Sequence, residues 1–331
     1  MPAPQIWFAA AHEQFPPSDL LAQAVEAAAA GFDGLACSDH FQPWWPEGQS
    51  GNALVWLGAA AQATQDLPIG TSVTPVAHRY HPAVIAQAFM TLEEMFPGRV
   101  YLGVGSGEAL NEVPVGDDWP SVGDQIARMD EGLDIIERLW AGEEVTHDGR
   151  FYRTEKARLY TRAAKPPRLY VSAFGPQAAR VAARHGDGLW SLADPEKVPE
   201  ILATYRAART EAGRDPGEVI LQVPTAWAED EERLLEGSRM WKATQPPAMY
   251  IENIPDPARM QDMVSDMSDA DFVSGALVST DPDEHVEKLA SFAALGATVL
   301  CLQNISGADP HGTIRTYGET VLPRLRERLG S

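Results

Sequence analysis

The sequence predicts an α/β fold of the (β/α)₈ TIM-barrel class. Eight short apolar stretches alternate with stretches of helical spacing at roughly thirty residues per unit, which is typical of parallel βαβ construction. Polar residues directly follow several apolar stretches, as they do where barrel strands open into a functional mouth. No Gly-, Pro- or Ser-rich linker divides the 331 residues, so we expect a single barrel domain over residues 1–331.

The eight apolar stretches are the predicted strands. Each is short and is bounded by turn-forming or polar residues. They are residues 5–10, 34–37, 67–73, 99–104, 168–171, 188–191, 219–223 and 299–303.

Helical spacing and end signals place helices between these strands. Ser18 is positioned to cap the first helix, and Gly31 closes it. Asp281 as the cap and Pro282 at the first position mark the helix before the last strand. The other helices are expected over residues 54–63, 84–95, 124–140, 177–184 and 198–212.

Two insertions interrupt the alternation, over about residues 112–165 and 226–275. The first contains a helix and then a hairpin, for which Asp148-Gly149 is the turn. The second is rich in acids, Met and Pro and lies between the seventh and eighth strands. Insertions after barrel strands usually build the active-site mouth, so we expect a lid or a substrate wall there.

Composition excludes several classes of partner. The net charge of −21 argues against nucleic acid and against an anionic membrane surface. The two cysteines, Cys37 and Cys301, lie in apolar strands and predict a reducing, cytoplasmic setting. The sequence shows no signal-peptide pattern and no apolar run long enough to span a membrane.

Candidate catalytic residues stand at the predicted strand ends. Glu13 follows the first strand, Asp39 and His40 follow the second, and Glu108 follows the fourth. His suits acid–base chemistry near neutral pH, although a surface turn with a capping Asp and an incidental His explains Asp39-His40 equally well. Glu108 alone reads as a solvated residue after a tight glycine turn. The glycines before it lack the G-x-G-x-x-G spacing, so no Rossmann site is expected.

The fifth predicted strand ends at residues 172–177, where a helix begins. Backbone N–H groups at a helix start favour an anion such as a phosphate, and a plain Gly-Pro turn is the alternative. No Cys and His spacing matches a metal site, and no G-x-S-x-G elbow is present. We therefore expect neither a metal nor ordinary hydrolase chemistry.

Several motifs together resemble one family. They are Ser38-Asp39-His40-Phe41-Gln42-Pro43-Trp44, Gly70-Thr71-Ser72-Val73, Arg79-Tyr80, and residues 82–87 and 102–112, with thinner matches at residues 174–176, 186–188 and 279–284. Through them the chain resembles the F420-dependent glucose-6-phosphate dehydrogenases of the bacterial-luciferase-like (β/α)₈ superfamily.

The resemblance implies that coenzyme F420, a deazaflavin hydride carrier, lies across the barrel mouth. It also implies a non-prolyl cis peptide at Ser72-Val73, forming a bulge behind the ring. The implied coenzyme contacts are Asp39, Ser72, Val73, Thr74, Pro75, Ser106, Gly107 and Asn111, with Ser172, Phe174, Gly175, Gln177 and Ala178 at the phosphate end. Phe174 stands where the family has a glycine.

Three residues are expected to carry the chemistry. Oxidising an alcohol needs a base for the hydroxyl proton while hydride leaves the carbon, and His40 suits that role. Glu108 fits as a proton donor to the reduced ring if burial raises its pKa. The family leaves open which of the two donates and which accepts. Trp44 is expected to stack near the ring and exclude water.

The substrate site departs from the family. The positions that grip a sugar phosphate there are, in this chain, Leu192, Pro195, Pro224, Ile251 and Gly275. Apolar residues cannot supply the charge-assisted donors that a dianion needs. Together with Glu13 and Trp44, and with Trp190, Trp227 and Trp241 close by in sequence, these positions predict a pocket for a neutral, fairly apolar alcohol or ketone.

The sequence therefore predicts an F420-dependent dehydrogenase or reductase acting on CH–OH groups, and the resemblance implies a homodimer. The alternative is a sugar-6-phosphate dehydrogenase with a rebuilt phosphate site, in which Arg239 and Lys242 would be the first suspects. A non-catalytic coenzyme carrier would not need both His40 and Glu108. An FMN monooxygenase of the superfamily would have no reason to keep the His, Trp and Glu set.

Overall fold

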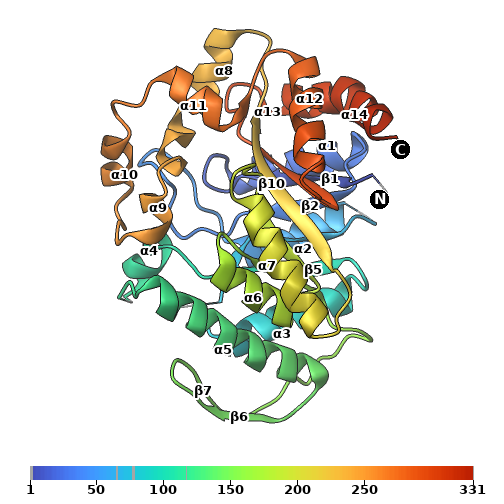
Figure 1. The fold of residues 1–331 in the computed structure, drawn as a ribbon, viewed down its shortest axis with the longest axis vertical. Coiled ribbons are helices and arrows are strands. Elements are labelled where there is room, and N and C mark those ends of the chain that lie inside the picture. The colour runs from blue at the N-terminus through green and yellow to red at the C-terminus, as the bar shows by residue number, and fades with distance from the viewer. Residues whose placement is uncertain (1–2, 65, 77–78, 117, 331) are drawn as a thin grey trace.

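Parallel strands close into a barrel that is surrounded by helices in the computed structural model, which describes residues 3–64, 66–76, 79–116 and 118–330 (Figure 1). The barrel closes because β10 pairs with both β9 and β12. In chain order, its strands are β1 (Gln5–Ala10), β2 (Gly34–Cys37), β3 (Ile69–Thr71), β5 (Val100–Gly105), β8 (Arg168–Ser172), β9 (Gly188–Leu192), β10 (Glu218–Ala226) and β12 (Val299–Asn304). The predicted (β/α)₈ class is confirmed.

The third predicted strand is shorter than expected. After β3, the Ser72-Val73 peptide is cis, as the family resemblance implied. The chain then forms the two-residue strand β4 (Thr74–Pro75), which pairs with β5. The mouth end of this strand is therefore irregular rather than a continuous strand over residues 67–73.

Aromatic rings fill the inside of the barrel. The ring centroids of Trp7 and Tyr101 lie 5.0 Å apart, and those of Tyr101 and Tyr170 lie 5.3 Å apart. Trp190 is 2% exposed and stacks on Tyr101 at 6.2 Å. Such a filled interior is a packed core rather than a channel. Trp190 belongs to that core, so its expected place beside the substrate wall is wrong.

The helices that cover the barrel begin and end near the predicted residues. α1 begins at Pro17, so Ser18 lies inside its first turn and is not the predicted cap. The Asp281 cap is confirmed, since its side chain accepts from Asp283 N. These helices are α1 (Pro17–Ala29), α2 (Ala53–Ala63), α3 (Pro82–Met95), α5 (Val122–Ala141), α6 (Pro176–His185), α7 (Val198–Glu211), α12 (Pro282–Ala293), α13 (Pro310–Thr316) and α14 (Leu322–Leu329).

The first insertion contributes mainly to the outer layer. α5 packs against both α3 and α6, where a barrel helix belongs. The predicted hairpin is present as β6 (Val145–Asp148) and β7 (Arg153–Ala157), and it lies outside α5 (Figure 1). At the start of this insertion, β5 is followed by the short helix α4 (Ala109–Glu112) and the turn Val113–Val115.

The second insertion lies between β10 and the short strand β11 (Leu277–Val278), which pairs with β10. It folds into α8 (Glu231–Ser238), a 3₁₀ turn (Arg239–Thr244), α9 (Ala248–Ile251), α10 (Pro257–Met263) and α11 (Asp269–Gly275). Trp119 Nε1 donates to Ile251 O, which joins α9 to the segment that follows α4. Within the described ranges, no helix is long and apolar enough to cross a membrane.

Candidate active site

His40 lies between two carboxylates at the mouth of the barrel. Its Nε2 is 3.3 Å from Glu13 Oε1 and 3.6 Å from Glu108 Oε2. These side chains follow β1, β2 and β5, which are far apart in sequence but lie on one side of the barrel, in the order β1-β2-β3-β5. The structure thus brings three of the predicted site residues into one acid–base cluster.

Asn111 orients the cluster from α4. Its Oδ1 accepts from the backbone N–H groups of Phe41 and Gln42, at 2.8 and 3.2 Å. Its Nδ2 therefore points the other way, donating to Glu108 Oε2 at 3.1 Å and lying 3.3 Å from His40 Nδ1. The predicted coenzyme contact Asn111 is, in this arrangement, a support of the acid–base pair.

Glu13 is fixed from beneath by Ser38. The Ser38 hydroxyl donates to Glu13 Oε2 at 2.6 Å and accepts from His12 N at 3.0 Å. Glu13 is 1% exposed. Its other oxygen faces His40, so the sequence-predicted pocket residue Glu13 is a partner of His40.

Glu108 follows Gly107, whose φ of +87° is in the left-handed region that favours glycine. Burial raises the pKa of the Glu108 carboxyl. His40 and Arg79 oppose that rise, and the nearby Glu13 carboxylate adds to it. The shift is in the direction that a proton donor near neutral pH requires.

The glycines before Glu108 make room for the neighbouring strand. A Cβ on Gly103 would lie 2.0 Å from Thr71 O, and one on Gly105 would lie 2.6 Å from Val73 Cγ2. Val73 is half-buried at the cis peptide and packs against this cleared backbone. The glycines therefore accommodate the bulge that carries Val73, which the sequence pattern alone did not reveal.

The predicted phosphate end lies where β8 leads into α6. Gly175 is the residue before α6, and a Cβ there would meet no atom within 4 Å among the described residues. Gln177 and Ala178 lie in the first turn of that helix. Phe174 is 50% exposed and Ser172 is half-buried. These residues border open space at a helix start, as an anion site requires.

A row of aromatic rings continues from His40 across the mouth. The rings of His40 and Trp44 are 5.3 Å apart, those of Trp44 and Tyr250 are 5.4 Å apart, and those of Tyr250 and Phe174 are 6.1 Å apart. Tyr250 comes from α9 in the second insertion, and its hydroxyl donates to Thr244 O at 3.0 Å. The sequence predicts that Trp44 belongs to this site, but it gives no indication of Tyr250.

Tyr250 was not predicted because no periodic pattern surrounds it in the sequence. Its ring partners, Trp44 and Phe174, are also far from it along the chain. Burial raises the pKa of its hydroxyl, and the charge of Glu108 adds to this effect. The ring contact with Trp44, which itself contacts His40, places Tyr250 next to the acid–base cluster.

The positions that replace the phosphate-binding residues of the family come from β9 and the segment after it, from β10, and from α9 and α11. Leu192 and Pro224 are half-buried at the mouth ends of the neighbouring strands β9 and β10. Pro195 and Ile251 are exposed, and Gly275 ends α11. Trp227 is held to Thr280 O through its Nε1, and Trp241 packs on Trp45 at 5.3 Å.

Two cations of the second insertion, Arg239 and Lys242, share one carboxylate. Arg239 makes two contacts with Asp269, at 3.2 and 2.9 Å, and Lys242 Nζ lies 2.8 Å from the same carboxylate. Lys242 Nζ also donates to Met267 O at 2.5 Å. Arg259 is exposed on α10.

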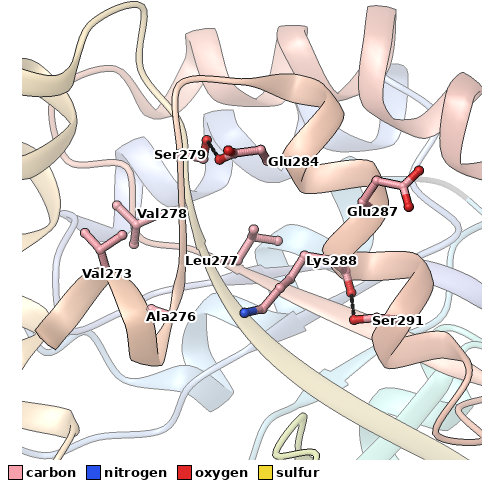
Figure 2. A pocket seen from close by; sticks show the side chains of 9 residues that line it. All are labelled: Val273, Ala276, Leu277, Val278, Ser279, Glu284, Glu287, Lys288 and Ser291. Atoms are coloured by element: carbon pink, nitrogen blue, oxygen red, sulfur yellow. Dashed lines mark hydrogen bonds between the residues drawn. The ribbon is translucent and has the colours of Figure 1, made fainter. Parts of the chain in front are cut away.

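A cavity of about 440 Å³ lies elsewhere, between α11, β11 and α12 (Figure 2). Val273, Leu277 and Val278 line its apolar part, and Lys288 and Glu287 line its rim. None of the lining residues belongs to the acid–base cluster. In the described ranges, no group of three or more His, Cys, Asp or Glu side chains is arranged to hold a metal ion.

Comparisons with known proteins identify the family of the chain. The chain matches the family model for luciferase-like monooxygenases over residues 3–299. The F420-dependent glucose-6-phosphate dehydrogenases of Nakamurella multipartita and Microbacterium testaceum are each 41% identical to it, over 98% and 97% of this chain and 97% of each relative.

Solved structures with the same fold include F420-dependent enzymes. An F420-dependent secondary alcohol dehydrogenase in complex with an F420-acetone adduct is similar with a TM-score of 0.93 and 34% identity, over 98% of this chain and 100% of that one. The coenzyme F420-dependent tetrahydromethanopterin reductase of Methanopyrus kandleri shares the fold, with a TM-score of 0.79 at 19% identity over 98% of this chain and 100% of that one.

Proposed function

The chain belongs to the luciferase-like monooxygenase family, among its F420-dependent dehydrogenases, and on this premise we propose that its substrate is a neutral, fairly apolar alcohol or the corresponding ketone. The resemblance stated from the sequence is confirmed. The chain is an F420-dependent oxidoreductase. Its substrate, and the role of each residue, are the subject of the proposal.

Two features of the mouth suit the coenzyme. Val73 lies at the cis peptide next to the glycines that precede Glu108, and open space borders Gly175. When bound, the coenzyme supplies the hydride acceptor of the oxidation. The residues that would hold it are those given by the resemblance: Asp39, Ser72, Val73, Thr74, Pro75, Ser106, Gly107, Asn111, Ser172, Phe174, Gly175, Gln177 and Ala178.

His40 and Glu108 are the proposed acid–base pair. His40 Nε2 takes the hydroxyl proton as the alcohol is oxidised, since an imidazole is basic enough near neutral pH. Burial raises the pKa of the Glu108 carboxyl, which favours its protonated form, and we assign to Glu108 the donation of a proton toward the coenzyme. Trp44 is 3% exposed beside His40 and excludes water from the reacting atoms.

The observation that carries the substrate proposal is the pairing of Arg239 and Lys242 with Asp269. These were the cations that a relocated phosphate site would use, and both are engaged by one carboxylate. A phosphate dianion would have to compete with that carboxylate in a chain of net charge −21. The rings of Trp44, Tyr250 and Phe174 instead form an apolar wall next to His40.

The second candidate is a sugar-6-phosphate dehydrogenase, favoured by the names of the relatives at 41% identity. The two candidates predict opposite preferences. Burying a phosphate against unpaired apolar positions costs several kcal/mol, and each 1.4 kcal/mol is about tenfold in affinity. We therefore expect kcat/KM for the better neutral secondary or cyclic alcohols to exceed that for glucose 6-phosphate about a thousandfold.

The experiment has two stages. Fluorescence titration of the protein with F420, FMN and NADP should show the tightest binding for F420, and equal or tighter binding of FMN would contradict the coenzyme assignment. Steady-state loss of oxidised F420 absorbance then compares a panel of neutral alcohols with glucose 6-phosphate. A higher kcat/KM for glucose 6-phosphate would select the second candidate.

We also propose a cytoplasmic homodimer. The support is two exposed valines on the outer helices: Val55 on α2 is 77% exposed, and Val84 on α3 is 53% exposed. Cys37 and Cys301 are free and buried, which suits a reducing compartment. Light scattering that gives the monomer mass at micromolar concentration would refute the dimer.

A further inference from the structure

Arg79 bridges two buried carboxylates beside the acid–base cluster. Its Nη2 donates to Asp39 O at 2.9 Å and lies 3.2 Å from Asp39 Oδ1. On the other side, its backbone N donates to Glu112 Oε2 at 2.6 Å, and its Nε lies 3.7 Å from Glu112 Oε1. One guanidinium therefore joins the loop after β2 to the end of α4.

Each end of this bridge is one residue away from the proposed chemistry. Asp39 directly precedes His40 in the chain. Glu112 directly follows Asn111, which contacts both His40 and Glu108. A displacement of either end would therefore change the separation of the acid from the base.

The bridge is held in a water-poor environment. Asp39 is 2% exposed, Glu112 is fully buried, and the Arg79 side chain is 8% exposed. Thr74 Oγ1 donates to Asp39 Oδ2 at 2.8 Å, which fixes the carboxylate further. A buried charge left without its partner is strongly unfavourable, so Arg79 keeps both carboxylates in place.

We propose that Arg79 is a positioning residue of the active site: by joining the loop after β2 to the end of α4, it sets the geometry between His40 and Glu108. The inference rests on the proposed roles of those two residues. Nothing in the sequence pattern marked Arg79 for this task, because its partners are about 40 and 33 residues away along the chain.

The positive charge of Arg79 also acts on the pKa of Glu108, and this effect has a definite direction. Glu108 is influenced by Glu13 as well as by His40 and Arg79, and it faces Tyr250. Arg79 and His40 lower the pKa of Glu108 against the effect of burial. Removing the Arg79 charge must then raise the pKa of Glu108 further.

The groups that face Arg79 itself are few. Among the described residues, its charge acts on Asp39, Glu112 and Glu108, and on the neighbouring Tyr80, whose ring centroid is 4.8 Å from Arg79 Cζ. Burial raises the pKa of Glu112 to about 7, and Arg79 opposes that rise. The variant tested must therefore be read against both Glu108 and Glu112.

The test uses Arg79→Gln, which removes the charge, and Arg79→Lys, which keeps it but cannot reach both carboxylates in the same way. Arg138→Gln is the matched control, because Arg138 also pairs with two carboxylates, Asp134 and Glu143, but on the exposed face of α5. Two quantities are measured. One is kcat with F420 and the best neutral alcohol; the other is the infrared carboxyl band of the coenzyme-free protein against pH.

The Glu108 and Glu112 bands are identified by their loss in Glu108→Gln and Glu112→Gln. We expect Arg79→Gln to lower kcat about 10²-fold, the size of effect that a misplacement of about 1 Å can cause. We expect its Glu108 band to titrate at higher pH than in the unmodified protein. In Arg79→Lys we expect the Glu108 band to titrate as in the unmodified protein, while kcat still falls. Arg138→Gln should change neither quantity.

The outcomes that would overturn the inference are distinct from failure of the proposed function. An unshifted Glu108 titration in a folded Arg79→Gln protein would exclude the charge effect, whatever coenzyme or substrate the protein uses. A kcat that falls only in proportion to the folded fraction would reduce Arg79 to a structural residue. If Arg79→Gln does not fold, full turnover in Arg79→Lys would overturn the positioning role, and a lowered kcat with ordinary titration would support it.

Discussion

In the barrel mouth, His40 directs one ring nitrogen toward two carboxylates; where α5 meets α6, His185 directs one nitrogen to each of two carboxylates. His185 Nδ1 lies 2.6 Å from Glu137 Oε2 and its Nε2 lies 2.8 Å from Asp130 Oδ1. The corresponding distances from His40 Nε2 are 3.3 and 3.6 Å. Good N–H···O hydrogen bonds are about 2.7–3.2 Å, so only His185 makes two of them.

The hydrogen-bonding environments of His185 and His40 also differ. Burial lowers the pKa of His185, but its hydrogen bonds to Asp130 and Glu137 raise it more, to about 9. His185 is therefore a charged tie between two helices across the neutral range. His40 shares its carboxylates with Ser38 and Asn111, and its second nitrogen meets both Gln42 O and Asn111 Nδ2. The difference teaches that a His between two acids is structural when both bonds are formed, and is available for proton transfer when they are not.

The largest expected effect separates the two histidines by turnover. A positioned acid or base contributes about 10²–10⁴-fold in rate. His40→Ala should therefore lower kcat with F420 and a neutral alcohol by about that factor, with F420 affinity within a few-fold. His185→Ala should leave the kcat of the folded protein close to that of the unmodified chain. Equal kcat values in the two variants would remove the distinction.

Glu108→Gln should also lower kcat, by about 10²–10⁴-fold, because the amide keeps the size of the side chain but cannot donate or accept the proton. We expect a smaller loss of kcat than in His40→Ala because the Glu13 carboxylate still faces His40 in this variant. The measurement is kcat against pH at saturating alcohol. Near-full turnover, with the chemical step shown to be rate-limiting, would contradict the role of Glu108.

A smaller effect concerns stability and the buried Glu112. Its folded pKa of about 7 is above the ordinary value of 4.5, so the stability it contributes is present below pH 4.5 and is lost as pH rises through 7. Gln does not titrate. The free energy of unfolding of Glu112→Gln, relative to the unmodified chain, should therefore increase by up to about 3 kcal/mol from pH 4.5 to pH 8.

Denaturant titrations monitored by circular dichroism at the two pH values measure this difference. A pH-independent difference between the two proteins would mean that Glu112 has the same pKa in the folded and unfolded chain, and would contradict the raised pKa.

The smallest expected effect is on the stability that His185 contributes, and it changes over a different pH range from that of Glu112. The pKa of His185 is raised from 6.5 to about 9, so its stabilising contribution is complete below pH 6.5 and is lost as pH rises through 9. We expect His185→Gln to cost about 1–2 kcal/mol at pH 6, allowing for solvent around its carboxylates, and less at pH 9.5. Urea unfolding at both values checks this, and a cost that grows with pH would contradict the ion-pair account.

Much of the barrel could be predicted because its strands and helices are local patterns. β1 and β2 have the predicted ends, and His40 and Glu108 were found because polar residues directly follow apolar strands. The roles of Arg79 and Tyr250 could not be predicted in this way, since each acts through contacts that only the closed barrel creates. Trp190 was misplaced because alternation along β9 does not say which face points into the barrel.

The central claim is that a neutral alcohol transfers hydride directly to F420 beside His40. The most direct measurement uses secondary alcohols deuterated at the carbinol carbon, and follows F420 reduction by stopped-flow absorbance and the coenzyme by mass spectrometry. We predict slower reduction than with the undeuterated alcohols and deuterium in the reduced coenzyme. Deuterium lost to water, or reduction by glucose 6-phosphate but by no neutral alcohol in the panel, would contradict the account.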